Sequence, residues 1–284
     1  MTTTLPGALV ASEWLSDHLS DPDLRILDCT WHHESTNLDG RTQYRGRHLP
    51  GAVHFDIDHV ADKSTGLPHM LPSAADFAKK VGLLGIGTGD RVVVYDRNCG
   101  GSAAARVWWM FRVFGYDNVA VLDGGYGKWT AEKRATEMSP VRPEPKTFSA
   151  SFSPHLVRTL DQMRANLASG AEQVLDARGP AKFDGSQEDL FPARKHGHIP
   201  DAVNLPWGDL VVAETGALVS PEAIRARFAV AGIDLAKPIV VTCASATVSC
   251  VLALALYVAG VGTAAVYDGS FAEWGLAEDT PVAA

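Results

Sequence analysis

The chain has 284 residues, of which 46% are hydrophobic and 20% are charged, as expected for a globular protein with one large or two ordinary domains. Its net charge of −8 comes without a basic stripe, which argues against nucleic acid and anionic membranes as partners. No stretch approaches roughly 18 uninterrupted apolar residues, and the first residues lack the pattern of a secretory signal. We therefore expect a cytoplasmic protein.

Short β-branched runs alternate with helical patterns along the first half of the chain. We expect strands near residues 24–28, 52–55, 91–95 and 118–122, and helices near residues 11–19, 73–83, 102–114 and 125–132. This alternation is typical of an α/β fold, in which helices cover both faces of a parallel sheet.

A proline-rich stretch, Ser139-Pro140-Val-Arg-Pro143-Glu-Pro145, follows this first half and is typical of an extended linker. We expect a first domain over residues 1–140, a linker over 141–154 and a second domain over 155–284. The second domain repeats the α/β pattern, with strands expected near residues 172–176, 202–205, 238–242 and 264–267.

The two halves match each other in sequence. Arg47-His-Leu-Pro-Gly-Ala-Val53 corresponds to Gly197-His-Ile-Pro-Asp-Ala-Val203, and Val92-Val-Val-Tyr-Asp96 corresponds to Ile239-Val-Val-Thr-Cys243. Near the end of each half, an Asp-Gly pair is followed by a tryptophan five residues after the glycine. Matched segments in the same order indicate a duplicated domain.

Cys243 ends a predicted buried strand and precedes an apolar helical pattern over residues 247–259. Backbone N–H groups of residues 244–249 can form an anion-binding nest there, and the field of the helix start favours a thiolate. The alternative is a cysteine that serves only as a small buried hydrophobic residue. Cys250 lies about two helical turns away, too far for a ready disulfide.

The other cysteines are Cys29 and Cys99. No Cys-x-x-Cys pair occurs, so we expect no metal site and no disulfide framework. The residue that corresponds to Cys243 in the first half is Asp96, so Cys99 is not expected to be a second catalytic centre. A redox role for Cys99 depends on its exposure.

The tandem His-[Leu/Ile]-Pro-x-Ala-Val motifs, the strand that ends in Cys243 and the two Asp-Gly-x-x-x-x-Trp motifs resemble the rhodanese-type sulfurtransferases. Within this family the chain is most similar to the mercaptopyruvate sulfurtransferases. The resemblance implies two rhodanese-like domains, of which the first lacks the nucleophile and contributes to the substrate cleft. It also implies that Cys243 takes sulfur from a donor as a persulfide and passes it to an acceptor, without a cofactor.

In mercaptopyruvate enzymes, a serine two residues after the cysteine, a histidine from the first domain and an aspartate eleven residues before that histidine form a proposed proton relay. The corresponding residues are Ser245, His69 and Asp58. The relay would protonate the enolate left by carbon–sulfur cleavage. Taken singly, His69 and Asp58 could instead be caps of turns or helices.

The chain departs from the family pattern in the active loop. Mercaptopyruvate enzymes usually have Cys-Gly-Ser-Gly-Val-Thr, whereas this chain has Cys243-Ala-Ser-Ala-Thr-Val248. An alanine in place of glycine costs about 1 kcal/mol where φ must be positive, so either φ stays negative or the ring of amides is reshaped. We expect the backbone at Ala244, Ala246, Thr247 and Val248 to bind the transferred sulfur.

A second departure concerns the donor carboxylate, which the family is thought to hold with two arginines. Those places hold Lys182, in a Lys-Phe pair, and Phe191. We expect Lys182 to attract the donor, although lysine lacks the bidentate fork of arginine. Arg178, Arg194 and Lys195 lie nearby and are either substitutes for the missing arginine or a solvated basic patch.

The preferred prediction is therefore a 3-mercaptopyruvate sulfurtransferase, with a small thiol, thioredoxin or cyanide as the acceptor. Thiosulfate is the alternative donor, although the residues just after Cys243 carry no positive charge for this dianion. A Cys-x₅-Arg phosphatase is disfavoured because the sixth residue after Cys243 is Ser249. A non-catalytic binding module is the third class of function considered.

Overall fold

The structure is a computed structural model that describes residues 4–98, 100–138, 141–191 and 193–284. Cys99, which we considered for a redox role, lies outside the described residues. The chain forms two compact units, and each is described by itself. Within the described residues, none of the helices combines the length and the apolar character needed to cross a membrane.

The first unit is built on a parallel sheet of five strands in the order β1-β5-β4-β2-β3. The strands are β1 (Leu9–Val10), β2 (Leu24–Asp28), β3 (Ala52–His54), β4 (Arg91–Tyr95) and β5 (Val119–Leu122). The helices are α1 (Ser12–His18), α2 (Gly40–Gly46), α3 (Ile57–Val60), α4 (Ala74–Leu83), α5 (Ser102–Val113) and α6 (Gly125–Ala131). Strand β4 is buried along its whole length, as expected for a central parallel strand covered on both faces.

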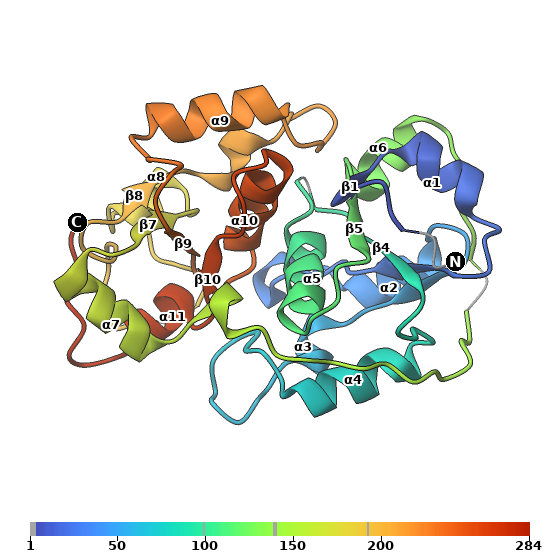
Figure 1. Cartoon of the computed structure of the whole chain (residues 1–284), viewed down its shortest axis with the longest axis horizontal. Helices are drawn as coiled ribbons and strands as arrows, with labels where there is room; N and C mark the ends of the chain where they lie inside the picture. Colours follow the sequence, from blue (N-terminus) through green and yellow to red (C-terminus); the bar gives the residue numbers. More distant parts are fainter. Residues whose placement is uncertain (1–3, 99, 139–140, 192) are drawn as a thin grey trace. The chain divides into compact units, whose positions relative to one another are not determined.

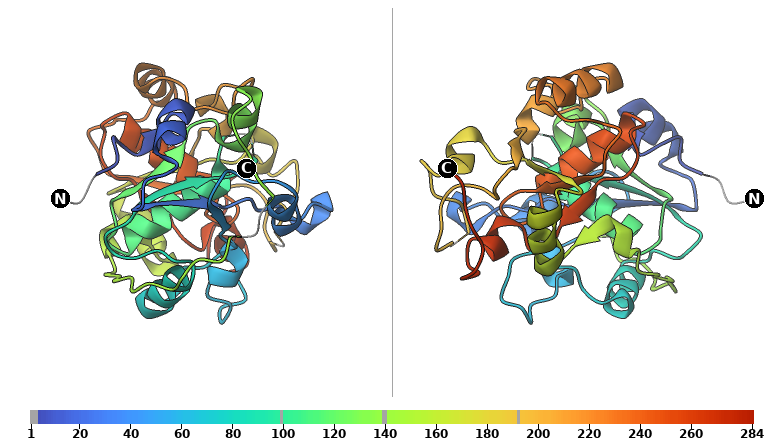
Figure 2. Two further views of the ribbon diagram at one scale, coloured as in Figure 1. Left: turned by 90° about the vertical axis from the view of Figure 1, so that its right-hand side faces the viewer. Right: turned by 60° about the vertical axis from the view of Figure 1, so that its left-hand side comes forward.

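The second unit repeats this plan with the strand order β6-β10-β9-β7-β8. The strands are β6 (Val157–Arg158), β7 (Gln173–Asp176), β8 (Val203–Asn204), β9 (Ile239–Thr242) and β10 (Ala265–Tyr267). The helices are α7 (Leu160–Ser169), α8 (Pro180–Phe183), α9 (Pro221–Val230), α10 (Ser249–Val258) and α11 (Ser270–Trp274). Figures 1 and 2 show the helices of each unit packed against its sheet, which confirms the predicted α/β fold of two duplicated domains.

Each strand predicted from the sequence lies within a residue of its observed bounds, and so do the four helices predicted in the first half. The helix predicted over residues 247–259 is shorter, because α10 begins at Ser249. Residues 243–248 form a loop instead, in which Ala246 has a left-handed backbone with φ of +55°. This loop leads into a helix whose residues from Ser249 to Leu256 are all buried.

Two short segments do not belong to the same unit as their neighbours in the sequence. Asp62–Leu71 is part of the second unit, and Val212–Leu218 is part of the first. The contiguous domains predicted over 1–140 and 155–284 do not include this exchange, since no local pattern reveals a distant packing partner. The stretch predicted as a linker has no helix or strand before Ser153 and packs on the first unit, where Phe148 is buried against Phe77.

Candidate active site

Cys243 is the first residue after β9, a central strand of the second sheet that pairs with β7 and β10. The carboxyl ends of parallel strands are where open α/β sheets place their ligands. Cys243 is 1% exposed, and the backbone N–H of Phe271 donates to its carbonyl oxygen at 2.9 Å. The sheet therefore fixes the backbone of Cys243 at the predicted edge.

Only one of the two alanines in the loop after Cys243 has a positive φ. Ala246 has φ of +55°, whereas Ala244 is not among the residues with positive φ in the described chain. The loop thus keeps a glycine-like conformation at one of the two positions, at a cost of about 1 kcal/mol. Ala246 is completely buried, so the surrounding structure holds it in this conformation.

Ser270, the first residue of α11, supports this loop. Its Oγ accepts hydrogen bonds from the N–H of Ala246 at 3.0 Å and from the N–H of Cys243 at 3.5 Å, and it donates to the carbonyl of Tyr267 at 2.8 Å. The N–H of Ala246 therefore has an acceptor in Ser270, and the expectation that this amide also serves the sulfur stays a prediction. For Ala244, Thr247 and Val248 the expectation stays a prediction.

The structure brings together two of the predicted relay residues. His69 Nδ1 lies 3.2 Å from Ser245 Oγ, and Ser245 Oγ lies 3.0 Å from Thr247 Oγ1. All three side chains are buried, and His69 has a positive φ of 59°. His69 is therefore not a surface cap, because its imidazole is hydrogen-bonded to the serine two residues after Cys243.

His69 reaches this position because the segment Asp62–Leu71 belongs to the second unit. The N–H of Leu71 donates to Asp268 Oδ2 at 2.9 Å, and the N–H of Asp62 donates to the carbonyl of Met70 at 2.9 Å. The ring of Phe191 stands edge-on to the imidazole at a centroid distance of 5.7 Å. These contacts restrain the segment on both sides of His69.

Asp58 lies in α3 of the first unit, where the indole N–H of Trp31 donates to its Oδ2 at 2.6 Å. The cap of α3 is Asp56, which accepts from the N–H of His59, so the alternative role of Asp58 as a cap is wrong. Its predicted role of orienting His69 stays a prediction.

A cavity of about 350 Å³ lies in the second unit, beside this site. Its lining includes Arg178, Lys182, Asp189, Phe191, Lys195 and Phe271. Phe191 also packs on His69, and the backbone of Phe271 holds Cys243, so the cavity borders the elements that carry this cysteine and the histidine. Its position fits a pocket for a small donor molecule.

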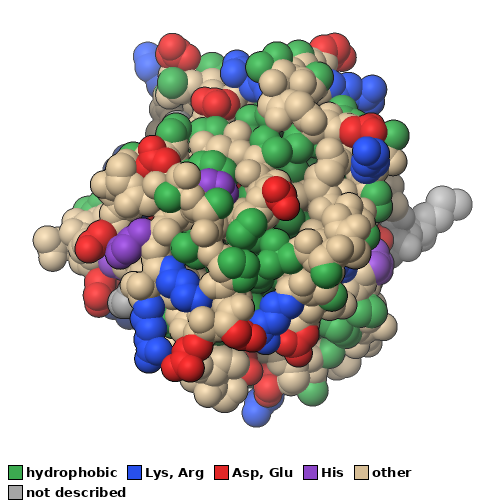
Figure 3. Space-filling view, turned by 90° about the vertical axis from the view of Figure 1, so that its left-hand side faces the viewer, with side chains coloured by type: hydrophobic (Ala, Val, Ile, Leu, Met, Phe, Trp, Pro, Cys, Tyr) green, Lys and Arg blue, Asp and Glu red, His purple; other side chains and the backbone are tan. Residues whose placement is uncertain are grey.

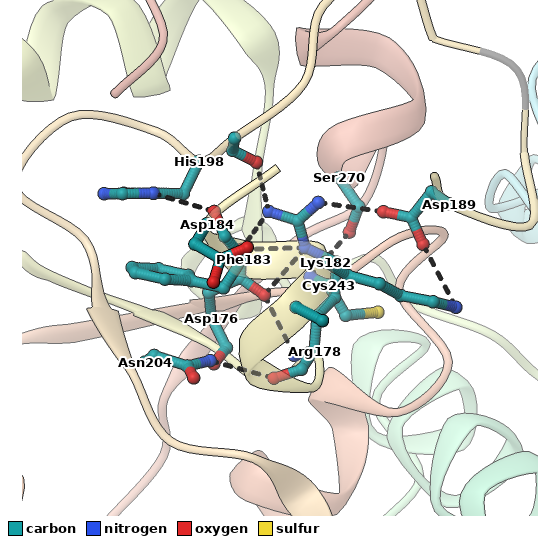
Figure 4. A network of polar contacts seen from close by, with 12 residues as sticks. Asp176, Arg178, Lys182, Phe183, Asp184, Asp189, His198, Asn204, Cys243 and Ser270 are labelled. Atoms are coloured by element: carbon teal, nitrogen blue, oxygen red, sulfur yellow. Dashed lines mark hydrogen bonds and ion pairs between the residues drawn. The ribbon is translucent and has the colours of Figure 1, made fainter. Parts of the chain in front are cut away.

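Lys182 lines the cavity, and a carboxylate lies beside it. Its Nζ lies 3.6 Å from Asp189 Oδ1, and Arg178 pairs with the other oxygen of Asp189 at 2.8 Å (Figure 4). The side chain of Asp189 is 7% exposed, so its charge is poorly screened. The negative charge of Asp189 therefore opposes the predicted attraction of Lys182 for an anionic donor.

Arg178 is buried and fully engaged. It forms a bidentate ion pair with Asp176 (Figure 4). It also donates to the carbonyl of Gly197 at 2.8 Å and lies 4.1 Å from the ring centre of Phe271. Burial lowers its pKa, but the hydrogen bonds and charges of Asp176 and Asp189 outweigh burial and raise the pKa overall. Arg178 is thus a structural cation rather than a free group for a substrate carboxylate.

The other two candidate substitutes are also paired. Lys195 Nζ donates to the carbonyls of Ala277, Glu278 and Thr280, and Arg194 pairs with Glu278 at 3.5 Å. Figure 3 shows that basic and acidic side chains are interspersed around a hydrophobic patch on the face of the second unit that it presents. No large field of one sign on this face substitutes for the missing arginine.

Ser270, Asp268 and the hydroxyl of Thr247 were not singled out from the sequence. Ser270 and Asp268 belong to the repeated Asp-Gly motif, and the residue that corresponds to Ser270 in the first half is Gly125, with φ of +53° against +51°. A serine where the repeat has a left-handed glycine is a signal that a side chain is needed there, but its partners are visible only in the structure.

Comparisons with known proteins agree with this arrangement. A family model described as "Rhodanese-like domain" matches residues 11–132 and 159–277. The chain belongs to the rhodanese family. This rhodanese protein is 38% identical to the 3-mercaptopyruvate sulfurtransferase of Homo sapiens and 41% identical to the thiosulfate sulfurtransferase of Bos taurus, in each case over 94% of this chain and 91% of the relative.

Among solved structures, it is similar to the 3-mercaptopyruvate sulfurtransferase SseA of Escherichia coli. The TM-score is 0.85 at 33% sequence identity, with 93% of this chain and 98% of SseA covered. The rhodanese protein described here is therefore a sulfurtransferase with the tandem organisation of these relatives. Because relatives named for either donor are similarly close, identity alone does not separate the two donors.

Proposed function

We propose that this sulfurtransferase takes the sulfur of 3-mercaptopyruvate as a persulfide on Cys243 and delivers it to a thiol or to cyanide. The observation that carries the proposal is the hydrogen bond between Ser245 and the buried imidazole of His69, two residues from Cys243 at the end of β9. Carbon–sulfur cleavage of mercaptopyruvate needs a proton at carbon, and a serine–histidine pair can move one.

In the first step, the thiolate of Cys243 attacks the sulfur of 3-mercaptopyruvate. A sulfur–sulfur bond forms, the carbon–sulfur bond breaks, and its electron pair leaves with the carbon as the enolate of pyruvate. The proton of the donor thiol, passed through Ser245 and His69, reaches that carbon and gives pyruvate. In the second step, an acceptor thiolate or cyanide attacks the outer sulfur and restores the thiolate of Cys243.

The remaining predicted residues have supporting roles in this proposal. The amides of Ala244, Thr247 and Val248 stabilise the persulfide anion at the start of α10, as amides at helix starts do for other anions. Lys182 attracts the donor carboxylate from the wall of the cavity. Asp58 orients the imidazole of His69. No cofactor is required by this chemistry.

Thiosulfate is the second candidate donor, and one observation favours it. Phe191 offers nothing to a carboxylate, and Arg178 and Lys182 already pair with Asp189. A site that holds the carboxylate weakly gives 3-mercaptopyruvate a smaller advantage over thiosulfate. Against thiosulfate, Ala244 and Ser245 bring no positive charge next to Cys243.

The experiment that tests the proposal is intact-protein mass spectrometry after mixing with either donor, with pyruvate release followed in parallel. We expect one sulfur atom on the native chain with 3-mercaptopyruvate and none on Cys243→Ser. Cys250→Ser is the matched control, because its hydroxyl can still donate to the carbonyl of Ala246 as the Cys250 thiol does. Loading by thiosulfate alone would favour the second donor, and loading by neither would indicate a binding module.

For the acceptor, we propose a thiol, either a small molecule or thioredoxin, with cyanide as the alternative. The test is to isolate the loaded protein and to compare its rate of sulfur loss to each of the three. The physiological acceptor is expected to unload the protein fastest at its cellular concentration. Equal rates for all three would contradict selective recognition of the acceptor.

A further inference from the structure

A second and larger cavity, of about 690 Å³, lies in the first unit. It is bordered by α2, β3, α3, α4 and residues 141–143, all in the unit that does not carry Cys243. Its volume lies within the range of about 300–1,000 Å³ that is common for small-molecule sites. The proposed sulfur transfer uses none of the residues that line it.

Cationic side chains gather around this cavity. Arg41 and Arg45 come from α2, Arg142 follows the predicted linker start, and Lys80 comes from α4. Among the described residues, Arg45 and Arg142 form no hydrogen bond or ion pair through their side chains, and Asp56 is the one carboxylate in the described lining. The cavity therefore carries excess positive charge in a protein whose net charge is −8.

Several other arginines of the first unit do have carboxylate partners. Arg91 pairs with Asp21 and Asp23, Arg25 with Asp90, Arg112 with Asp117, and Arg134 with Glu132. Guanidinium groups that line one cavity without carboxylate partners are suited to bind phosphate or carboxylate groups in a bidentate manner.

The rest of the lining is apolar. Val53, Val60, Leu84, Val141 and Pro143 form part of the wall. Leu83 also lines the cavity and is 57% exposed, although it is a large hydrophobic residue. A cavity lined by both cations and aliphatic side chains matches a ligand that has both a charged group and an apolar body.

One histidine of the lining adds little charge to this site. His54 Nδ1 lies 3.1 Å from the carbonyl of Asp28, and burial lowers the pKa of His54, which favours its neutral ring. Lys80 Nζ donates to the carbonyls of His59 and Val60, which leaves its charge uncompensated by any carboxylate there. The positive charge of the cavity therefore comes from Lys80 and the arginines.

We propose that this cavity is a binding site for a small amphipathic anion, a molecule with a phosphate or carboxylate group and an aliphatic body. The guanidinium groups of Arg45 and Arg142 bind the anionic group, and the aliphatic part lies against Leu83, Leu84 and Val141. The inference is independent of the sulfur donor and acceptor proposed above.

The test is isothermal titration calorimetry of the full chain with octyl phosphate, octanoate and inorganic phosphate. Octyl phosphate or octanoate is expected to bind at least about tenfold more tightly than inorganic phosphate, since burial of the aliphatic chain adds to the ionic contact. The two alkyl ligands distinguish a phosphate from a carboxylate as the preferred group. If inorganic phosphate binds as tightly as both, the amphipathic assignment is wrong.

Two sets of variants locate the binding. Arg45→Gln combined with Arg142→Gln is expected to weaken the alkyl anion at least about tenfold, and Leu83→Asp is expected to weaken it as well. Arg227→Gln, in α9 of the second unit, is the matched control and should bind like the native chain. Sulfur loading of Cys243 should be unchanged in all of these variants, which shows that they fold. Unaltered binding by the double variant would overturn the proposal.

Discussion

At the scale of single residues, the active loop shows how a strained backbone is held in place. Ala246 keeps a left-handed conformation that glycine adopts more readily, and Ser270 Oγ accepts a hydrogen bond from its N–H. Ser270 itself has a φ of +51°. The turns after β9 and β10 thus each contain a left-handed residue, and the side chain of Ser270 connects them by hydrogen bonds.

The two alanines of the loop are expected to respond differently to glycine. Ala246→Gly should keep the free energy of unfolding within about 0.5 kcal/mol of the native value, because relief of left-handed strain offsets the loss of a buried methyl group. Ala244→Gly is the control. It relieves no strain and should lower the free energy of unfolding by about 0.5–1 kcal/mol. Urea denaturation measures both. A larger loss for Ala246→Gly than for Ala244→Gly would contradict the strain assigned to Ala246.

Asp189 is expected to control the affinity for an anionic donor. Asp189→Asn should lower the KM for 3-mercaptopyruvate by about threefold to tenfold with kcat little changed, because a buried negative charge beside Lys182 is removed. Steady-state kinetics measure the effect. Asp184→Asn is the control, since that carboxylate is exposed in the same region and accepts from Ser186. An unchanged KM for Asp189→Asn would show that Lys182 does not contact the donor.

At the scale of elements, the segment Asp62–Leu71 matters most, because it carries His69 to the loop after β9. It contains no helix or strand, and its position depends on a few contacts. One of these is the hydrogen bond from the N–H of Leu71 to Asp268, which precedes α11. Asp268 and Ser270, which lie close together near the start of α11, therefore support both the His69 segment and the loop after Cys243.

Loss of the hydrogen bond between Asp268 and the segment Asp62–Leu71 should reduce proton transfer more than it reduces the reactivity of the Cys243 thiolate. Asp268→Ala is expected to reduce kcat with 3-mercaptopyruvate by about tenfold or more, since a general acid contributes about 10²–10⁴ when it is well placed. Alkylation of Cys243 by iodoacetamide should change much less. Asp268→Asn retains a side-chain acceptor for Leu71 and should restore most of the activity. If Asn and Ala variants behave alike, the hydrogen bond does not position His69.

At the scale of the whole molecule, the two repeats carry different residues at the position that follows the matching central strand. Where the second unit has Cys243 after β9, the first has Asp96 after β4. Asp96 is buried and accepts hydrogen bonds from the N–H groups of Ala104 and Asn98. Burial raises its pKa to about 7, although these hydrogen bonds act to lower it.

Stability should therefore depend on pH through Asp96. Because its pKa is about 7 in the folded chain and near 3.8 when unfolded, the native state binds more protons between these values. The free energy of unfolding should thus fall by a few kcal/mol as pH rises from about 4 to 7, and should level off above. Asp96→Asn should flatten this profile in urea titrations followed by tryptophan fluorescence, and Asp117→Asn, at an exposed position, should not. An unaltered slope in Asp96→Asn would contradict the assignment.

The sequence predicts most of the strands, because strands such as β4 and β9 are short runs rich in β-branched residues. It does not predict β1 and β6, which are two residues long and carry no pattern. The pairing of Ser245 with His69 was expected from family resemblance. The roles of Ser270, Asp268 and Asp189 were not, because each depends on a partner that is distant in sequence and is brought near only by tertiary folding.

The exchange of Asp62–Leu71 into the second unit has a consequence for the order of events during synthesis. This segment leaves the ribosome before any other part of the unit in which it packs. The first half of the chain can form its own sheet while the histidine-bearing segment still lacks its partner. The contact between His69 and Ser245 can therefore form only after the second half of the chain has been translated.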